Sequence, residues 1–343
     1  MATSPRGWSR LKQRAVQLAQ PLSAQLELTY SCNWRCVFCY NPRHHDLRRM
    51  GAPEWTEVLD DLRTLGTLYV TLTGGECLTH PEFFEIATAV RARAMALRVL
   101  TNGALIDDEK ADRLAALQAA VEMSLHGASA ATHDQATGRP GSFDAMWAGL
   151  GRLRKRDVPV LLKGPLTSLN ENEVDAMIAL AETRGLALRM DASISPRDDG
   201  DTSPLRYTAS PEGVRRLMKT SAARGELPVT SRDRGGLNCG LGRVTVTLDP
   251  EGNVYPCMQW RKSSLGNVRE QRLTELWRSS PVRAEAAEVA RAANERMLDL
   301  GDPFARFPYC PALAAQHTGD PLTPHPAHVM NARLAEDVRR EMA

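Results

Sequence analysis

Short apolar runs with the character of buried β-strands recur along the first two-thirds of the chain. Each run is followed by a longer segment in which apolar residues recur at helical spacing. Strands that alternate with helices of this length predict βαβ units and a parallel sheet. The expected strands are 24–29, 68–72, 97–101, 119–125, 158–163 and 186–190, and the expected helices are 54–65, 82–94, 108–118, 142–156, 171–184 and 211–224. This α/β pattern fits a partial barrel or a doubly wound sheet, and both folds carry their chemistry at the carboxyl ends of the strands.

The pattern changes near residue 195. Segments 195–210 and 226–242 are polar and contain turn residues, so we expect loops there. In RVTVTLDPEGNVYPC (243–257), alternating apolar positions flank a D-P-E-G turn and predict a β-hairpin. A helical stretch at 270–299 and a Pro-rich tail follow. We therefore divide the chain into an N-terminal helical extension (1–23), a core (24–225), a small C-terminal module (235–325) and a C-terminal tail (326–343).

Composition and charge exclude several classes of protein. Apolar residues make up 43% of the 343 residues and charged residues 24%, which is typical of a folded globular chain. The net charge of +2 is too small to indicate nucleic acid or an anionic membrane as the main partner. We find neither an apolar run of membrane-spanning length nor a signal peptide, so we expect a cytoplasmic protein.

The seven cysteines indicate metal chemistry. An odd count in a chain without a signal peptide argues against a disulfide framework. Cys32, Cys36 and Cys39 follow the first expected strand with the spacing C-x3-C-x2-C. Three thiolates leave one iron of a four-iron cube without a protein ligand, so a small molecule can bind that iron. The alternative is structural zinc with His44 or His45 as fourth ligand, although zinc sites favour paired cysteines.

Four motifs together resemble one family. CNWRCVFC (32–39) after the first strand and TGGE (73–76) after the second resemble the radical S-adenosylmethionine (radical SAM) superfamily. SLHG (124–127) and ATGRPGSF (136–143) resemble its SPASM/twitch branch, which carries an auxiliary iron–sulfur cluster. The resemblance implies a partial (β/α)6 TIM-like barrel followed by a small β-hairpin and helix module for the auxiliary cluster.

The resemblance also implies roles for individual residues. The first three cysteines would bind a [4Fe–4S] cluster whose open iron is chelated by the amino and carboxylate groups of SAM. The residues implied to bind SAM are Phe38 near adenine, Gly74, Gly75 and Glu76 at the methionyl ammonium, Ser124 at the ribose or carboxylate, Asn102, and Arg139 at the carboxylate. Simpler explanations are a tight turn for the glycines, a locally satisfied hydroxyl for Ser124, an N-G turn for Asn102 and a solvated side chain for Arg139.

The implied chemistry begins with one electron from an external donor such as flavodoxin or ferredoxin. The reduced cluster passes this electron to SAM, and the C–S bond breaks to give methionine and a 5′-deoxyadenosyl radical. That radical abstracts hydrogen from an unactivated C–H bond of the substrate. The cofactor supplies the difficult chemistry, and the protein supplies position and a dry cavity.

A second cysteine set brackets the expected hairpin. Cys239 and Cys257 lie on either side of it, and Cys310 lies in the tail. These residues resemble the auxiliary module, but a full SPASM module has seven cysteines, and Leu313 stands where a C-x2-C partner of Cys310 is expected. We predict one auxiliary [4Fe–4S] cluster with three cysteine ligands. The alternative is that all three are ordinary buried cysteines.

Residues on the substrate side are suggested by position alone. Cys77 directly follows TGGE and either packs at the edge of the site or acts as a hydrogen-atom donor. Lys163, Asp191, Arg197 and Asp199 lie at or beyond the ends of the fifth and sixth strands, where a solvated loop explains the charges equally well. We take Glu76, Cys77, Asp191 and Arg197 as the catalytic candidates.

The sequence therefore predicts a radical SAM enzyme of natural-product or antibiotic biosynthesis. Because only about 20 residues precede the first strand, we expect no leader-peptide-binding domain there and favour a small sugar, aminosugar or nucleoside-sugar substrate. Its reaction would be dehydrogenation, epimerisation or decarboxylation. One alternative is a maturase that crosslinks or epimerises a ribosomally made peptide. Another is a non-catalytic iron–sulfur scaffold, against which TGGE argues because a scaffold needs no methionyl site.

Overall fold

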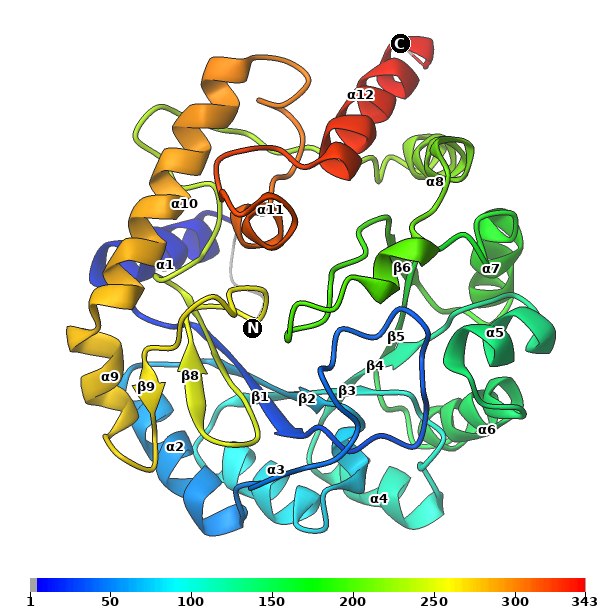
Figure 1. The fold of residues 1–343 in the computed structure, drawn as a ribbon. Coiled ribbons are helices and arrows are strands. Elements are labelled where there is room, and N and C mark those ends of the chain that lie inside the picture. Colours follow the sequence, from blue (N-terminus) through cyan, green and yellow to red (C-terminus); the bar gives the residue numbers. More distant parts are fainter. Residues whose placement is uncertain (1–4, 343) are drawn as a thin grey trace.

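The six apolar runs form the parallel strands of one sheet. The computed structural model describes residues 5–342, and its nine strands are ordered β6-β5-β4-β3-β2-β1-β7-β8-β9. Strands β1 to β6 pair in parallel, as predicted. Their bounds are β1 Ser23–Thr29, β2 Tyr69–Gly74, β3 Ala96–Thr101, β4 Ala120–Ser124, β5 Val160–Pro165 and β6 Leu188–Asp191. Because β6 and β9 are edges, the sheet of the described chain is an open, partial barrel (Figure 1).

Helices cover the outer face of this sheet (Figure 1). They are α2 Ala52–Thr64, α3 Phe83–Ala92, α4 Asp108–Ala116, α5 Ala130–Thr137, α6 Ser142–Arg154, α7 Val174–Glu182 and α8 Pro211–Ala223. Helix α5 was not predicted, because its sequence has almost no apolar periodicity. Ser129 begins it by accepting a hydrogen bond from the amide of Thr132, and Gly138 ends it in the left-handed conformation.

The two faces of the strands differ in polarity. Leu26, Leu28 and Leu72 are fully buried in the core between sheet and helices. Alternate residues point to the opposite face, and there β1 and β2 carry Glu27 and Thr73, both also buried. The inner face of the barrel is therefore polar, which suits a site rather than a second core.

The predicted hairpin is present and extends the core sheet. Strands β7 (Thr245–Leu248) and β8 (Asn253–Tyr255) are antiparallel, and the short β9 (Gly266–Asn267) pairs with β8. Strand β7 also pairs in parallel with β1, which the sequence did not indicate. The C-terminal module is thus joined to the core by backbone hydrogen bonds as well as by side chains.

The helical stretch expected at 270–299 is two helices, α9 (Leu273–Ser279) and α10 (Pro281–Leu300). The break occurs because Pro281 has no amide hydrogen and Ser280 caps the second helix by accepting from the amide of Arg283. Short 3-10 helices lie at η1 (Cys77–Thr79) and η2 (Ser203–Tyr207).

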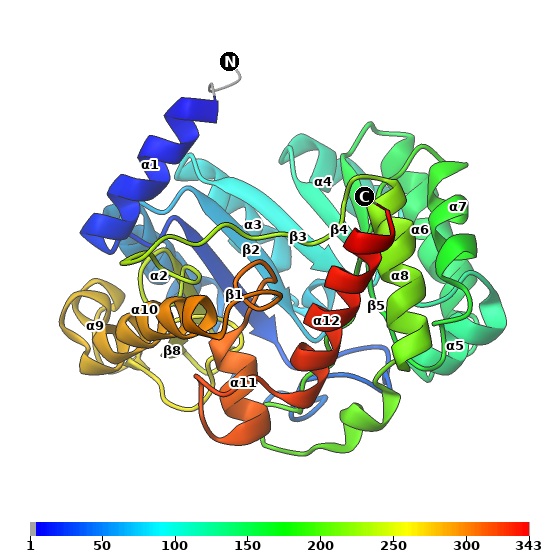
Figure 2. The same cartoon turned by 90° about the horizontal axis from the view of Figure 1, so that it is seen from above.

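The chain ends in two helices, α11 (Pro311–Thr318) and α12 (Pro326–Glu341). Helix α12 occupies the predicted tail and packs along α8 (Figure 2). Helix α1 (Pro5–Leu18) falls in the predicted N-terminal extension, of which residues 1–4 lie outside the described residues. None of the helices in residues 5–342 is long and apolar enough to cross a membrane.

Candidate functional site

The first cysteine set lies on the loop that leaves the carboxyl end of β1, as expected. Cys32, Cys36 and Cys39 are all partly buried. Burial raises the pKa of Cys32 to about 11. Burial, and then the proximity of Cys39 and Cys32, raises the pKa of Cys36. Three neighbouring thiols that resist ionisation are a donor set that positively charged iron would stabilise as thiolates.

Helix α5 holds the cysteine loop from one side. The amides of Arg35 and Val37 donate to the carbonyls of Thr137 and Ala136, at 2.9 and 3.0 Å. A Cβ atom on Gly138 would lie 2.7 Å from the carbonyl oxygen of Arg35. The ATG part of ATGRPGSF thus positions the loop through backbone contacts, a role that the sequence analysis missed.

The TGGE segment holds the loop from the other side. The amides of Gly75 and Glu76 donate to the carbonyls of Thr29 and Ser31, at 2.7 and 2.9 Å. Gly74 has φ of +126°, and a Cβ there would lie 2.3 Å from the oxygen of Thr29. A Cβ on Gly75 would lie 2.4 Å from the oxygen of Ser31. Both glycines are therefore required by the close approach of two backbones.

Glu76 organises the ends of the strands. Its carboxylate is buried and accepts hydrogen bonds from the hydroxyl of Thr101 at 2.7 Å, the amide of Asn102 at 2.7 Å and the amide of Leu78 at 3.1 Å. Burial raises its pKa. The side-chain amide of Asn102 in turn donates to Asn33 Oδ1 at 2.6 Å. This chain of contacts connects the loops after β1, β2 and β3.

Cys77 faces the core rather than the cavity. Its side chain is fully buried, and its Sγ lies 3.2 Å from the carbonyl oxygen of Leu100. Burial, and then the neighbouring Glu76, raises the pKa of Cys77 well above its usual value. The thiol is therefore protonated and donates to that carbonyl.

Phe38 and the SLHG motif come together in a group of aromatic rings. The Phe38 ring lies 4.9 Å from the His126 ring, and Trp34 lies 5.5 Å from His133. Burial, and then His133, lowers the pKa of His126 to about 3, so this imidazole is neutral. His126 Nδ1 is buried without a hydrogen-bond partner. An unpaired ring nitrogen beside Phe38 fits the binding of a polar aromatic group such as adenine.

The remaining predicted SAM contacts divide into two kinds. Ser124 is half-buried at the end of β4, two residues before His126. Arg139 is exposed beyond the end of α5. The structure therefore brings Ser124 to the aromatic group and leaves Arg139 at the surface.

The second cysteine set is brought together by the hairpin and α11. Burial, and then the proximity of Cys310 and Cys239, raises the pKa of Cys257 to about 12. Cys310 is the N-cap of α11, and the amide of Leu313 donates to its Sγ at 3.4 Å. Leu313 thus contributes its backbone to the sulfur. These neighbouring thiols fit the thiolate chemistry of an iron–sulfur cluster in the same way as the first set.

A buried charge cluster links the two regions. Arg261, which follows Cys257 by four residues, contacts Glu27 Oε1 through Nη2 at 2.6 Å and Asp198 Oδ2 through Nε at 3.3 Å. The amide of Asp198 donates to the carbonyl of Tyr40 at 2.9 Å. Burial raises the pKa of Asp198 to about 7. The sequence analysis missed this cluster, although an acidic residue inside the apolar run 24–29 was a signal for it.

The substrate-side candidates occupy different places. Lys163 is half-exposed and pairs with Glu122 at 2.6 Å. Arg197 pairs with Asp201 at 3.4 Å, and both Arg197 and Asp199 line a cavity of about 400 Å³.

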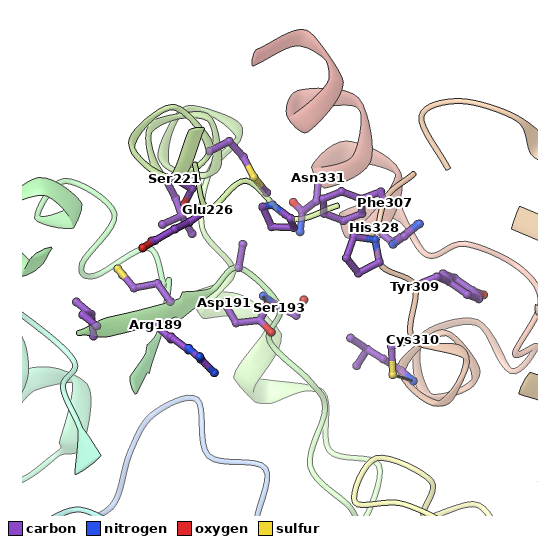
Figure 3. Close-up of a pocket in the computed structure, with 18 of the residues that line it drawn as sticks. Arg189, Asp191, Ser193, Ser221, Glu226, Phe307, Tyr309, Cys310, His328 and Asn331 are labelled. Carbon is purple, nitrogen blue, oxygen red and sulfur yellow. Dashed lines mark hydrogen bonds between the residues drawn. The ribbon is translucent and has the colours of Figure 1, made fainter. Parts of the chain in front are cut away.

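Asp191 lines a different and larger cavity of about 620 Å³. This cavity lies between β6, α8 and α12, and it also includes Cys310 (Figure 3). The structure therefore connects Asp191, but not Arg197, with the auxiliary cysteines through a shared cavity.

Two family models match the chain, one over the segment that contains the first cysteine set and one over the segment that contains the second. Residues 26–181 match the family model described as the radical SAM superfamily, and residues 239–310 match the SPASM model, described as an iron-sulfur cluster-binding domain.

Characterised relatives are moderately similar. The mycofactocin maturase MftC of Mycobacterium ulcerans is 30% identical over 80% of this chain and 79% of its own length. The chain spans 65% of the length of MftC from Mycolicibacterium smegmatis, which is 31% identical over 70% of this chain. An AdoMet-dependent heme synthase of Methanosarcina barkeri is 27% identical over 75% of this chain and 82% of its own length.

Solved structures share the fold at low identity. Native anSMEcpe with bound AdoMet and Cp18Cys peptide has a TM-score of 0.74 at 16% identity, and the alignment covers 94% of this chain and 98% of that one. SuiB of Streptococcus suis bound to its precursor peptide SuiA has a TM-score of 0.65 at 14% identity, with 83% and 72% covered.

These findings confirm the predicted family, the fold class, the cofactors and the prediction that the protein is a radical SAM enzyme. The two matched domains imply SAM, a SAM-binding [4Fe–4S] cluster and an auxiliary iron–sulfur cluster as the cofactors. The chain belongs to the radical SAM superfamily, in the branch whose members carry a SPASM-type auxiliary-cluster domain.

Proposed function

We propose that this radical SAM enzyme is a peptide maturase that acts in the biosynthesis of a natural product. The observation that carries the proposal is the 30% identity with a mycofactocin maturase over 80% of the chain. PqqA peptide cyclase of Rhizobium meliloti, 25% identical over 83% of the chain, supports the same class. The relatives thus favour the peptide alternative over the small sugar substrate that the sequence analysis preferred.

We assign the first cluster to Cys32, Cys36 and Cys39 and the auxiliary cluster to the second cysteine set. When bound, the first cluster supplies the electron that cleaves SAM to methionine and a 5′-deoxyadenosyl radical. The residues of this chain position the reactants: α5 and TGGE fix the cysteine loop, and Glu76 fixes the ends of β2 and β3 against it. The buried His126 ring and the partly buried Phe38 ring exclude water from the adenine side.

The substrate side is assigned to the cavity of about 620 Å³ that includes Asp191 and Cys310. Such a volume is large enough for one amino-acid side chain together with its flanking backbone. We assign the external electron to a flavodoxin or ferredoxin, and we place the protein in the cytoplasm, where such donors are available.

The test is a comparison of substrate classes with anaerobically reconstituted protein, dithionite and SAM. One arm contains peptides encoded by short reading frames beside the gene, and the other contains a mixture of aminosugars and nucleotide sugars. We expect 5′-deoxyadenosine together with a mass or retention change in a peptide, measured by liquid chromatography and mass spectrometry. The Cys36→Ala variant is the control and should make neither product.

Two outcomes would contradict the proposal. Conversion of a sugar, with every peptide unchanged, would show that the substrate is a small sugar metabolite rather than a peptide. Absence of 5′-deoxyadenosine in all arms, with the clusters intact, would support the scaffold alternative.

A further inference from the structure

One wall of the cavity of about 620 Å³ is formed by helix α12, beyond the residues that match the SPASM model. His325 is the N-cap of this helix, and His328 and Asn331 follow within it at spacings of three, so the three side chains lie on one side of α12. They are 5%, 6% and 5% exposed, respectively. Figure 3 shows His328 and Asn331 beside the cavity, across from Arg189 and Asp191.

Each of these three side chains has a buried polar atom without a partner. The atoms are His325 Nδ1, His328 Nε2 and Asn331 Oδ1. Buried polar atoms in proteins are nearly always hydrogen-bonded, so each exception requires an explanation. All three atoms belong to residues that line one cavity, where a bound ligand could supply the missing hydrogen bonds.

The chemistry of the α12 wall favours an uncharged group as this partner. Burial lowers the pKa values of His325 and His328 to about 4, so both imidazoles are neutral. The His328 ring packs against Phe307 at 5.6 Å and Tyr309 at 4.9 Å. A charged ligand group would lose its hydration at this neutral, aromatic wall, because the charged residues of the cavity, Arg189, Asp191, Arg224 and Glu226, lie on β6 and just beyond the end of α8 rather than on α12. An uncharged hydrogen-bond donor or acceptor on an apolar group would lose little hydration free energy at the same wall.

We propose that the α12 wall binds an uncharged, hydrogen-bonding side chain of the peptide substrate, with its polar end at His328 and Asn331 and its apolar body against Phe307. This inference rests on the proposed function, because it names the part of a peptide that the cavity takes. Cys310 lines the same cavity, whereas Cys239 and Cys257 do not. The bound residue therefore lies at the Cys310 side of the auxiliary site.

The ligand-side test uses three probes that share one ring. These are N-acetyltyrosinamide, N-acetylphenylalaninamide and N-acetyl-4-carboxyphenylalaninamide, which end in a hydroxyl, a hydrogen and a carboxylate. Their dissociation constants are measured on the holoenzyme with SAM by ligand-detected NMR, without turnover. We expect the hydroxyl probe to bind roughly three- to tenfold more tightly than the hydrogen probe, as one added hydrogen bond implies. The carboxylate probe should bind most weakly.

The protein-side test removes the polar atoms one at a time. Asn331→Leu and His328→Phe should each reduce the preference for the hydroxyl probe toward onefold while leaving the affinity for the hydrogen probe unchanged. Asn172→Leu is the matched control, because Asn172 is exposed and does not line the cavity. A crystal structure of the parent enzyme soaked with N-acetyltyrosinamide tests the position of the probe directly and needs no variant. The phenol should lie at Phe307 with its oxygen at His328 or Asn331.

Equal affinities of the parent enzyme for the hydroxyl and hydrogen probes would overturn the inference, as would a soaked probe bound elsewhere. A preference that persists in both variants would do the same. Because binding is measured without catalysis, a preserved preference in a protein that converts no peptide would count against the proposed function and not against this site.

Discussion

Gly75→Ala tests whether the close approach of TGGE to the cysteine loop positions the first cluster. The added Cβ would lie 2.4 Å from the oxygen of Ser31 and 2.6 Å from that of Tyr30, whereas real contacts of this kind stay above 3.0 Å. Both obstacles are backbone atoms, so no side-chain rotation relieves them. The two segments have to separate, and this stretches the hydrogen bonds that Gly75 and Glu76 donate to the loop.

The cost of this separation can be bounded. Overpacking in a close-packed region costs about 1–3 kcal/mol, and each weakened backbone hydrogen bond costs ~0.5–1.5 kcal/mol. Because the shift falls on the start of the cysteine loop, we expect much of this free energy to appear in cofactor binding. The affinity for SAM should fall roughly ten- to a hundredfold. Iron bound by the first cluster should fall in parallel.

The assay combines iron and sulfide analysis of anaerobically reconstituted protein with SAM dissociation constants from equilibrium dialysis. The control is Gly151→Ala in helix α6, where no atom lies within 4 Å of the added Cβ. Alanine in a helix interior stabilises by about 0.5–1 kcal/mol relative to glycine, so this variant should melt at a higher temperature and bind SAM normally. Full iron content and parental SAM affinity in Gly75→Ala would refute the reasoning.

Three further predictions concern single side chains. Glu76→Gln places an amide NH2 against a hydrogen-bond donor such as the amide of Asn102. The free energy of unfolding in urea should therefore fall by about 1–3 kcal/mol, and SAM should bind more weakly. Parental stability and parental SAM affinity would contradict a role for Glu76 in the site. Arg261→Met leaves Glu27 buried without its countercharge and should lower the free energy of unfolding in urea by ~3–5 kcal/mol. The double variant Arg261→Met with Glu27→Gln should be less destabilised than the single variant. An equal or larger destabilisation of the double variant would contradict the pairing. We propose that the second cluster accepts an electron from the substrate radical, so Cys310→Ala should reduce reconstituted iron from about eight to about four per chain, keep SAM cleavage and abolish the peptide product. Turnover of the peptide at the parental rate would contradict this redox role.

Local pattern accounts for most of the fold that was predicted. The six parallel strands and the hairpin follow from apolar periodicity and from one turn signal, both of which act within a few residues. The pairing of β7 with β1 joins residues more than 200 positions apart, and no local pattern encodes it. Helix α5 was missed because capping and contacts with the cysteine loop stabilise it, rather than an apolar stripe. The division of 270–299 into two helices was readable from Pro281.

The functional site likewise contains residues that local sequence predicts and residues that only the fold brings together. The spacing of Cys32, Cys36 and Cys39 predicts their cluster, because all three ligands lie on one loop. The pairing of Glu27 with Arg261 depends on the fold, which brings β1 to the segment after the hairpin. Sequence spacing cannot assign such a partner, although it can indicate that a buried acidic residue needs one.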